Sequence, residues 1–250
     1  MQKQAYFRFY AELNDFLSAG HRYHLFGYSF KGTPAIKDCI EALGVPHTEV
    51  DLILVNGASV RFDCKLQNGD YVSVYPVFES VDVSQVTRLR AKPLRDPRFI
   101  ADVHLGKLAR KLRMLGFDIL YRNDYDDIEI IDLSLTDRRI ILTRDRGILM
   151  NKSVTHGYWI RADHVYDQLT EVLNRFDLFA QVTAFRRCLV CNGVLTQVDK
   201  EAIKARLLPK TDLYYDEFHV CCECGRFYWK GSHYREMKIY IENLLKHQRQ

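Results

Sequence analysis

Short apolar runs that read as strands alternate with segments of helical periodicity in the middle third of the chain. The strand-like runs lie at residues 98–101, 119–121, 140–143 and 158–160. Between the first two runs, apolar side chains keep the i, i+3, i+4, i+7 spacing of one buried helix face, at Leu105, Leu108, Ala109, Leu112 and Leu115. A further helix is predicted from Asp127, with Ile128, Ile131 and Leu135 on its apolar face, and another over 165–179. Strands alternating with helices predict an α/β fold with a doubly wound parallel sheet.

The first 80 residues have a different order, ββαββ, with strands predicted at 6–10, 23–26, 51–55 and 70–75. The helix is predicted over 33–44, with Thr33 as N-cap, Pro34 in the first turn and Gly44 as its end. This order resembles the α+β ubiquitin-like β-grasp fold, and NGDYVSVYPV is similar to its small sulfur-carrier branch. Sulfur carriers end in a free Gly-Gly tail, whereas this chain continues past Pro76. A docking or structural role is therefore expected, and a sulfur-carrier fusion is disfavoured.

Composition shifts divide the chain further. Pro93 and Pro97 lie among alternating charges and predict a linker. The predicted parts are a β-grasp domain at 1–82, a linker at 83–97, an α/β domain at 98–182, and a cysteine-containing module with a C-terminal helix at 183–250.

The formal net charge of +4 hides an uneven distribution. Residues 1–80 carry 7 basic and 9 acidic side chains, whereas residues 88–113 carry 9 basic and 2 acidic ones, a local excess of seven positive charges. A basic stretch beside carboxylates suits a polyanionic substrate held near bound cations. A solvated basic linker would give the same count.

No hydrophobic stretch follows the amino end, and no apolar run approaches 18 residues. We therefore expect a soluble, cytoplasmic protein without a membrane partner. The seven cysteines, four of them in two paired spacings, favour metal binding over a disulfide framework.

Aspartates follow the strand-like runs of the middle third, at Asp102, Asp126, Asp127, Asp145 and Asp163. In a parallel sheet the carboxyl ends of the strands share one edge, so these side chains are predicted to gather there. Such a cluster is costly unless a divalent cation neutralises it, and carboxylate oxygens are the ligands that Mg²⁺ prefers. Each aspartate also has a plainer explanation as a helix N-cap. Asp163 is the weakest of the five, because a small boundary error would move it into solvent.

Basic side chains lie near these aspartates, at Lys107, Arg110, Arg113, Arg144 and Arg146. We predict that they contact phosphates of a polyanionic substrate, with Arg113 at the margin of the helix face that carries Lys107 and Arg110, the alternative being a solvated polar face. His104 is expected to be a surface residue.

Two C-x-x-C knuckles, Cys188 with Cys191 and Cys221 with Cys224, are separated by 29 residues. Asn192-Gly193 and Gly225 directly follow the knuckles and are predicted to form tight turns. Each knuckle presents two thiolates, and four thiolates suit one closed, structural Zn²⁺ site. Redox use of either pair is the alternative. Cys39, Cys64 and Cys222 are expected to be ordinary thiols.

The spacer between the knuckles is long and basic, and is predicted to be a strand-loop excursion near nucleic acid. The run Phe227 to Tyr234 mixes aromatic and basic residues, which suits stacking on unpaired bases or, equally, packing on the ribbon.

The string FIADVHLGKLARKLRMLGFDILY, the later pair DD, the string RRIILTRDR and the cysteine module together resemble one nuclease family. It is the RNase family defined by the carboxyl-terminal domain of the mutator exonuclease, a PIN-like branch with a zinc ribbon, and relatives often carry a ubiquitin-like segment in front. The resemblance covers roughly residues 98–235. It implies that residues 98–182 are a PIN-like nuclease domain, that residues 183–250 are a zinc ribbon with a C-terminal helix, and that the basic side chains near the aspartates contact RNA. It implies a metal-dependent ribonuclease that uses Mg²⁺ or Mn²⁺ on RNA, with Asp102, Asp126 or Asp127, and Asp145 as its acidic residues.

The alternative function is a catalytically inactive RNA-binding or adaptor protein. In either case the β-grasp domain is expected to dock to a protein partner.

Overall fold

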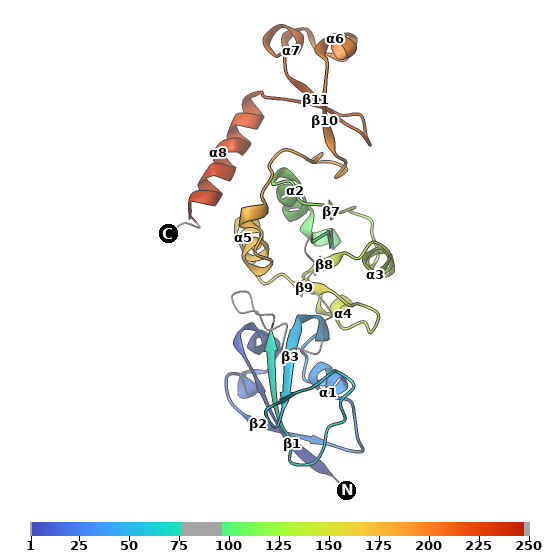
Figure 1. Cartoon of the computed structure of the whole chain (residues 1–250), viewed down its shortest axis with the longest axis vertical. Coiled ribbons are helices and arrows are strands. Elements are labelled where there is room, and N and C mark those ends of the chain that lie inside the picture. Colours follow the sequence, from blue (N-terminus) through green and yellow to red (C-terminus); the bar gives the residue numbers. More distant parts are fainter. Residues whose placement is uncertain (1, 77–96, 248–250) are drawn as a thin grey trace. The chain divides into compact units, whose positions relative to one another are not determined.

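The computed structural model describes residues 2–76 and 97–247 (Figure 1). Most of the predicted linker at 83–97 lies outside the described residues. By the density of internal packing, the chain forms two compact units. The first contains Met1–Pro97 and Asp127–Trp159, and the second contains Arg98–Asp126 and Ile160–Gln250. The predicted nuclease region thus contributes elements to both units.

The amino-terminal part of the first unit is a five-stranded sheet in the order β2-β1-β5-β3-β4. Its elements are β1 (Lys3–Phe9), β2 (Phe26–Phe30), α1 (Ile36–Ala42), β3 (Val50–Val55), β4 (Ala58–Ser59) and β5 (Tyr71–Pro76). The first and last strands, β1 and β5, pair in parallel, and the other pairs are antiparallel. This topology confirms the predicted ubiquitin-like β-grasp fold.

Two predicted details of this domain are wrong. Helix α1 begins after Ala35 rather than Thr33, because the preceding residues are extended: Leu66 donates its N–H to the Pro34 carbonyl at 3.0 Å. The second strand begins at Phe26 rather than Tyr23, because Tyr23 has a φ of +63° and donates its N–H to Asn14 Oδ1 at 2.7 Å. Gly44, with a φ of +93°, follows the end of α1 as predicted.

A four-stranded sheet has the order β7-β6-β8-β9, and its pairs β6–β7 and β8–β9 are parallel. The elements are β6 (Phe99–Ala101), α2 (Gly106–Met114), β7 (Ile119–Leu120), α3 (Asp127–Thr136), β8 (Ile140–Thr143), α4 (Arg146–Leu149), β9 (Gly157–Trp159) and α5 (Val165–Arg175). Strands and helices alternate, and this confirms the predicted α/β class. Helix α5 ends before the predicted residue 179, because Asp177 has a φ of +49° and turns the chain.

The helix periodicity was a good guide for α2 and a poorer one for α3. All five apolar positions of the predicted α2 face are buried at 1 % exposure or less. In α3, however, Ile128 is 71 % exposed and Leu135 is 40 % exposed, whereas Ile130 and Ile131 are buried. Helix α3 begins at Asp127 as predicted, but its buried face is rotated from the predicted one.

The last part of the chain is an antiparallel ribbon in the order β10-β11-β12, followed by a long helix. Its elements are β10 (Leu195–Val198), α6 (Lys200–Ile203), α7 (Pro209–Tyr214), β11 (Phe218–Cys221), β12 (Phe227–Trp229) and α8 (Ser232–His247). The spacer between the cysteine knuckles is therefore not a simple loop. It contains two short helices, begun by the Asp199 side chain, which accepts from Glu201 N–H, and by Pro209.

Helix α8 packs within the second unit through aromatic contacts. The Tyr240 ring lies edge-on to Tyr166 of α5, and the Lys111 ammonium of α2 sits 3.6 Å from the Tyr240 ring centroid. Burial lowers the pKa of Lys111. None of the helices in the described part of the chain is both long enough and apolar enough to cross a membrane.

Candidate functional site

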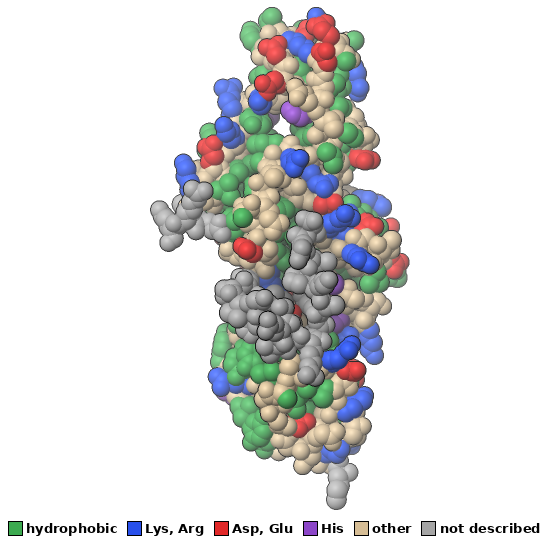
Figure 2. Space-filling view, in the orientation of Figure 1, with side chains coloured by type: hydrophobic (Ala, Val, Ile, Leu, Met, Phe, Trp, Pro, Cys, Tyr) green, Lys and Arg blue, Asp and Glu red, His purple; other side chains and the backbone are tan. Residues whose placement is uncertain are grey.

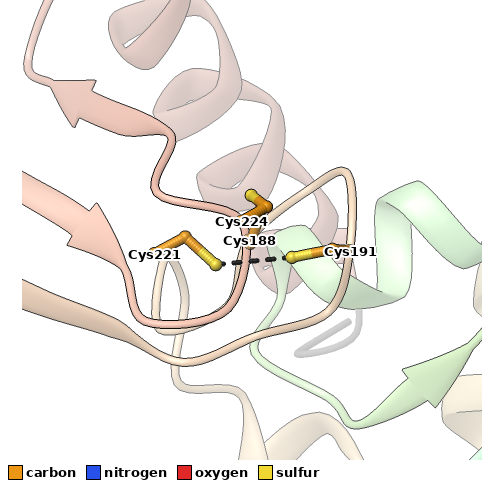
Figure 3. Close-up of side chains that lie close together, drawn as sticks. All are labelled: Cys188, Cys191, Cys221 and Cys224. Atoms are coloured by element: carbon orange, nitrogen blue, oxygen red, sulfur yellow. Dashed lines mark hydrogen bonds between the residues drawn. The ribbon is translucent and has the colours of Figure 1, made fainter.

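The four knuckle cysteines converge on one point between the loops that hold them (Figure 3). Their Sγ atoms all lie within 4.8 Å of one another, with Cys188 and Cys224 at 3.6 Å and Cys191 and Cys221 at 3.3 Å. A tetrahedral zinc with Zn–S bonds of about 2.3 Å places its sulfurs about 3.8 Å apart. The quartet therefore has the size and the ligand set of a closed zinc site.

Backbone turns hold the knuckles in this arrangement. Asn192 has a φ of +74° and Gly225 a φ of +68°, so both follow their knuckles in the left-handed region. Cys188 N–H donates to the Gly193 carbonyl at 2.8 Å, and Gly225 N–H donates to the Cys221 carbonyl at 2.9 Å. Both turns agree with the sequence prediction.

The electrostatics of the quartet call for a cation. Burial raises the pKa of the Cys188 thiol, but hydrogen bonds from the Tyr228 hydroxyl at 3.1 Å and from nearby backbone N–H groups outweigh it and lower that pKa to about 6. Burial and the neighbouring thiols raise the pKa of Cys191 to about 12. The Cys188 thiolate therefore forms readily, whereas Cys191 needs a bound metal ion to lose its proton.

Arg113 corrects one prediction. It was expected to contact RNA, but its side chain is 3 % exposed and bonds to backbone carbonyls. The guanidinium donates to the carbonyl of Ile119 at 3.0 and 3.1 Å and to the carbonyl of Val190 at 2.7 Å. Arg113 therefore links α2, β7 and the first knuckle instead of facing solvent.

Three further side chains, Asp118, Arg187 and Asn192, complete this link, which together with Arg113 we call the knuckle joint. Asn192 Oδ1 accepts from Ile119 N–H at 3.1 Å, and its Nδ2 donates to Asp118 Oδ1 at 2.8 Å. The other oxygen of Asp118 pairs with Arg187 at 3.3 Å. The first knuckle is thus fixed to the start of β7 by charged and polar groups.

The five predicted catalytic aspartates differ in their surroundings. Asp102 directly follows β6 and is 6 % exposed, whereas Asp126, Asp127, Asp145 and Asp163 are exposed. Asp102, Asp126 and Asp163 belong to the second unit, and Asp127 and Asp145 belong to the first. Within residues 2–76 and 97–247, the cysteines are the group of potential ligands that meets at close range, and the aspartates are not in it.

Asp145 follows β8 by two residues and is the N-cap of α4. Its Oδ1 accepts from Gly147 N–H at 2.7 Å, and its own N–H donates to Thr143 Oγ1 at 2.8 Å. These bonds fix the direction of the side chain. Asp145 therefore is a helix N-cap, the plainer explanation given for it from the sequence. The cap uses Oδ1 and not Oδ2.

The residues flanking Asp145 also have internal contacts. The Arg146 guanidinium carbon lies 3.9 Å from the Trp159 ring centroid and 5.1 Å from that of Phe16. Trp159 Nε1 donates to the Arg144 carbonyl at 3.2 Å. Arg146, predicted to bind RNA, is therefore half-buried in an aromatic contact, whereas Arg144, Lys107 and Arg110 are exposed.

The β-grasp domain supplies part of these contacts. Glu49, fully buried, accepts from Trp159 N–H at 2.7 Å, and His47 Nε2 donates to the Val154 carbonyl at 2.7 Å. The rings of Phe16 and Trp159 lie 5.0 Å apart. We call this set the β-grasp joint: Phe16, His47, Glu49, Arg146 and Trp159. It fixes the segment that follows Asp145.

The remaining cysteines behave as expected of ordinary thiols. Cys39 is buried, and burial raises its pKa. Cys64 is partly buried, Cys222 is exposed, and all three are free. His104 is exposed, as predicted.

Comparison with known families decides what the α/β and ribbon elements are. The model of the Mut7-C RNAse domain matches residues 97–241, more than half of the 250 residues. The chain belongs to the Mut7-C RNase family. The Mut7-C ubiquitin model matches residues 2–82, so both halves of the predicted resemblance are confirmed. No curated protein matches this Mut7-C chain, and no solved structure matches it.

The two joints of this Mut7-C protein were missed by sequence reasoning. Arg113 was read as a surface cation because it lies at the margin of a basic helix face, and Asn192 was read as a turn residue alone. Glu49 follows Pro46-His47-Thr48 in a short stretch between predicted elements and carried no signal. The contacts of these residues depend on segments that are 73 to 110 positions away.

Proposed function

We propose that this protein is a metal-dependent ribonuclease that hydrolyses RNA phosphodiester bonds with Mg²⁺ or Mn²⁺ held by aspartates. The observation that carries the proposal is the match of the RNase domain over residues 97–241, within which Asp102 directly follows β6 and Asp145 follows β8 by two residues. The cysteine quartet is proposed to hold a structural Zn²⁺.

Chain topology supports this choice of aspartates. Within the second unit β6 and β7 pair in parallel, and within the first unit β8 and β9 pair in parallel. Open α/β sheets bind ligands beyond the carboxyl ends of their strands, and the aspartates follow these ends. Asp102 and Asp145 are therefore proposed as the main ligands, with Asp126 or Asp127 as a further one and Asp163 as an auxiliary one.

The donor set fits the proposed ions, because hard divalent cations take carboxylate oxygens. When bound, Mg²⁺ or Mn²⁺ supplies an activated water and stabilises the charge that develops on the leaving oxygen. The aspartates orient the site and need not transfer protons. Lys107, Arg110 and Arg144, all exposed, are proposed to hold the RNA backbone beside it.

The experiment is RNA cleavage by Asp145→Asn in the full chain. Asparagine caps a helix as well as aspartate does, so this change removes the charge and keeps the cap. We expect cleavage in Mn²⁺ to fall about a hundredfold or more, since even supporting groups around a metal cost tenfold to a hundredfold. RNA binding, measured on the same variant, should be retained.

The matched control is Asp167→Asn, which removes a charge from the exposed first turn of α5 and should leave cleavage unchanged. Absence of cleavage by the unmodified chain with any divalent ion would instead favour the RNA-binding adaptor. A cytoplasmic location, an RNA substrate and a protein partner for the β-grasp domain remain predictions of this proposal.

A further inference from the structure

Two adjoining cavities lie in the second unit, where the ribbon meets the start of α8. Their volumes are about 430 and 500 Å³, within the range of small-ligand pockets. Both are lined by Leu189, Tyr228, Trp229, Tyr234 and Met237. The shared wall is therefore mainly aromatic, and it is built by β12 and the first turns of α8.

Two of the shared aromatic side chains have different tasks. The Tyr228 hydroxyl is within hydrogen-bonding distance of Cys188 Sγ at 3.1 Å and accepts from Leu189 N–H at 3.2 Å, so it is committed to the knuckle. Trp229 is 39 % exposed and contacts Tyr215 and Phe218 on one side. Trp229 is thus supported by the ribbon while part of its surface remains open to a ligand.

The cavities are also basic. Arg110 and Arg226 line the second cavity, and neither forms an ion pair with a residue of the described ranges. Arg187 and Lys230 line the first cavity, but they are paired with Asp118 and Glu217. The single acidic lining residue among these, Glu236, lies 3.6 Å from the His233 ring.

Arg110 connects two predictions that the sequence made separately. Arg110 was predicted to contact RNA because of its place on α2. The run Phe227 to Tyr234 was predicted to stack on unpaired bases because it mixes aromatic and basic residues. In the structure, Arg110 and Trp229 line the same cavity. The face drawn in Figure 2 has basic, acidic and apolar side chains interspersed over the ribbon end and α8. Aromatic faces beside unpaired guanidinium groups are the chemistry that binds unpaired nucleotides.

We propose that these two cavities form a binding subsite for unpaired nucleotides of a single-stranded RNA. A base stacks on Trp229, and Arg110 and Arg226 hold the adjoining phosphates. This inference deepens the proposed ribonuclease function and rests on it. It assigns the ribbon a direct part in selecting single-stranded RNA, in addition to its structural zinc.

The test measures RNA binding separately from cleavage. Full-length protein carrying Asp145→Asn is titrated with a fluorescein-labelled ten-nucleotide oligouridine and with a ten-base-pair RNA duplex, using fluorescence polarisation. We expect Trp229→Ala to weaken binding of the single strand about tenfold, within the range for loss of one stacked base, and to leave duplex binding unchanged. Trp229→Phe should retain most of the affinity.

The matched control is Tyr214→Ala, which removes a 70 % exposed aromatic side chain of the same ribbon that lines neither cavity. A second pair uses charge. Arg110→Gln should weaken binding several-fold more than Arg235→Gln, because both remove one positive charge but the exposed Arg235 lines neither cavity. Zinc content and melting temperature of each variant report whether the ribbon is still folded.

Equal affinities for Trp229→Ala and Tyr214→Ala, together with equal affinities for the two arginine variants, would overturn the subsite. So would equal weakening of single-strand and duplex binding, which indicates a non-specific charge effect. If Trp229→Ala loses its zinc, the comparison of Arg110→Gln with Arg235→Gln tests the subsite instead. Cleavage by the unmodified chain is scored independently, so the ribonuclease can stand while the subsite fails, and the reverse.

Discussion

The knuckle joint and the β-grasp joint both attach an appended module to elements of the α/β sheet, but by different chemistry. The knuckle joint is polar, with a buried guanidinium donating to carbonyls and an amide bridging to Asp118. The β-grasp joint is largely aromatic, with Arg146 stacked on Trp159 and one buried carboxylate, Glu49. Each joint uses an arginine that the sequence pattern assigned to RNA. An arginine in a basic segment is therefore weak evidence for an RNA-binding surface, because it can instead contact backbone carbonyls or aromatic rings of a neighbouring module.

The largest effect should come from loss of the metal that supports the knuckle joint. Cys191→Ser is expected to abolish zinc binding and unfold the ribbon, because structural zinc in zinc-finger peptides binds with about 10–16 kcal/mol, comparable to the whole stability of a domain. Zinc content and limited proteolysis within residues 183–247 measure it. Cys222→Ser changes an exposed cysteine beside a ligand and should keep the metal. Retention of zinc by Cys191→Ser would contradict a four-thiolate site.

A smaller but still large effect is expected at Arg113. Arg113→Met removes the buried guanidinium and leaves the carbonyls of Ile119 and Val190 without their donor, at about 1–3 kcal/mol for each unsatisfied group. We expect a loss of about 3 kcal/mol in the free energy of unfolding of the second unit, measured by urea denaturation. Arg110→Met, on the exposed face of the same helix, should change that free energy by less than about 0.5 kcal/mol. Similar effects of the two variants would mean that the knuckle joint contributes little.

The β-grasp joint should respond more weakly. Glu49→Ala leaves the Trp159 N–H without the acceptor that lies 2.7 Å from it, and we expect a loss of about 2 kcal/mol in the stability of the first unit. Glu49→Gln keeps an acceptor oxygen and should cost less than the alanine variant. Thermal unfolding of the two variants and the unmodified chain makes the comparison. The hydrogen bond requires the alanine variant to be less stable than the glutamine variant. Equal losses in the two variants would point to the charge of Glu49 instead, because both remove it.

The sequence predicts elements and motifs that depend on local spacing or on a periodic pattern. The two joints depend on neither, because their residues meet only in the folded chain. Cys188, Cys191 and the second knuckle could be found because metal geometry requires a fixed spacing within each pair. Helix α2 could be found because burial of one face imposes a period on its apolar positions, and strand β8 because its short run, apolar up to Thr143, is buried throughout. Arg113 and Glu49 follow no period, since their partners come from segments brought near by the fold. The aspartates lie between these cases, because strand ends can be read from the sequence but the distances between them cannot.

The smallest expected effect is at Arg146, where packing and RNA contact can be separated. Arg146→Ala removes the contact with Trp159 and should lower the stability of the first unit by about 1 kcal/mol, the upper end for an exposed cation–π contact. Arg146→Lys keeps the charge but loses the planar guanidinium, so it should show most of the same loss. In the Asp145→Asn background, RNA affinity should fall less for Arg146→Ala than for Arg144→Ala, because Arg144 is the exposed member of the pair. A larger loss of RNA affinity for Arg146→Ala than for Arg144→Ala, with affinity restored in Arg146→Lys, would show that Arg146 contacts RNA. Glu49 and His47 would then be the main support of the β-grasp joint.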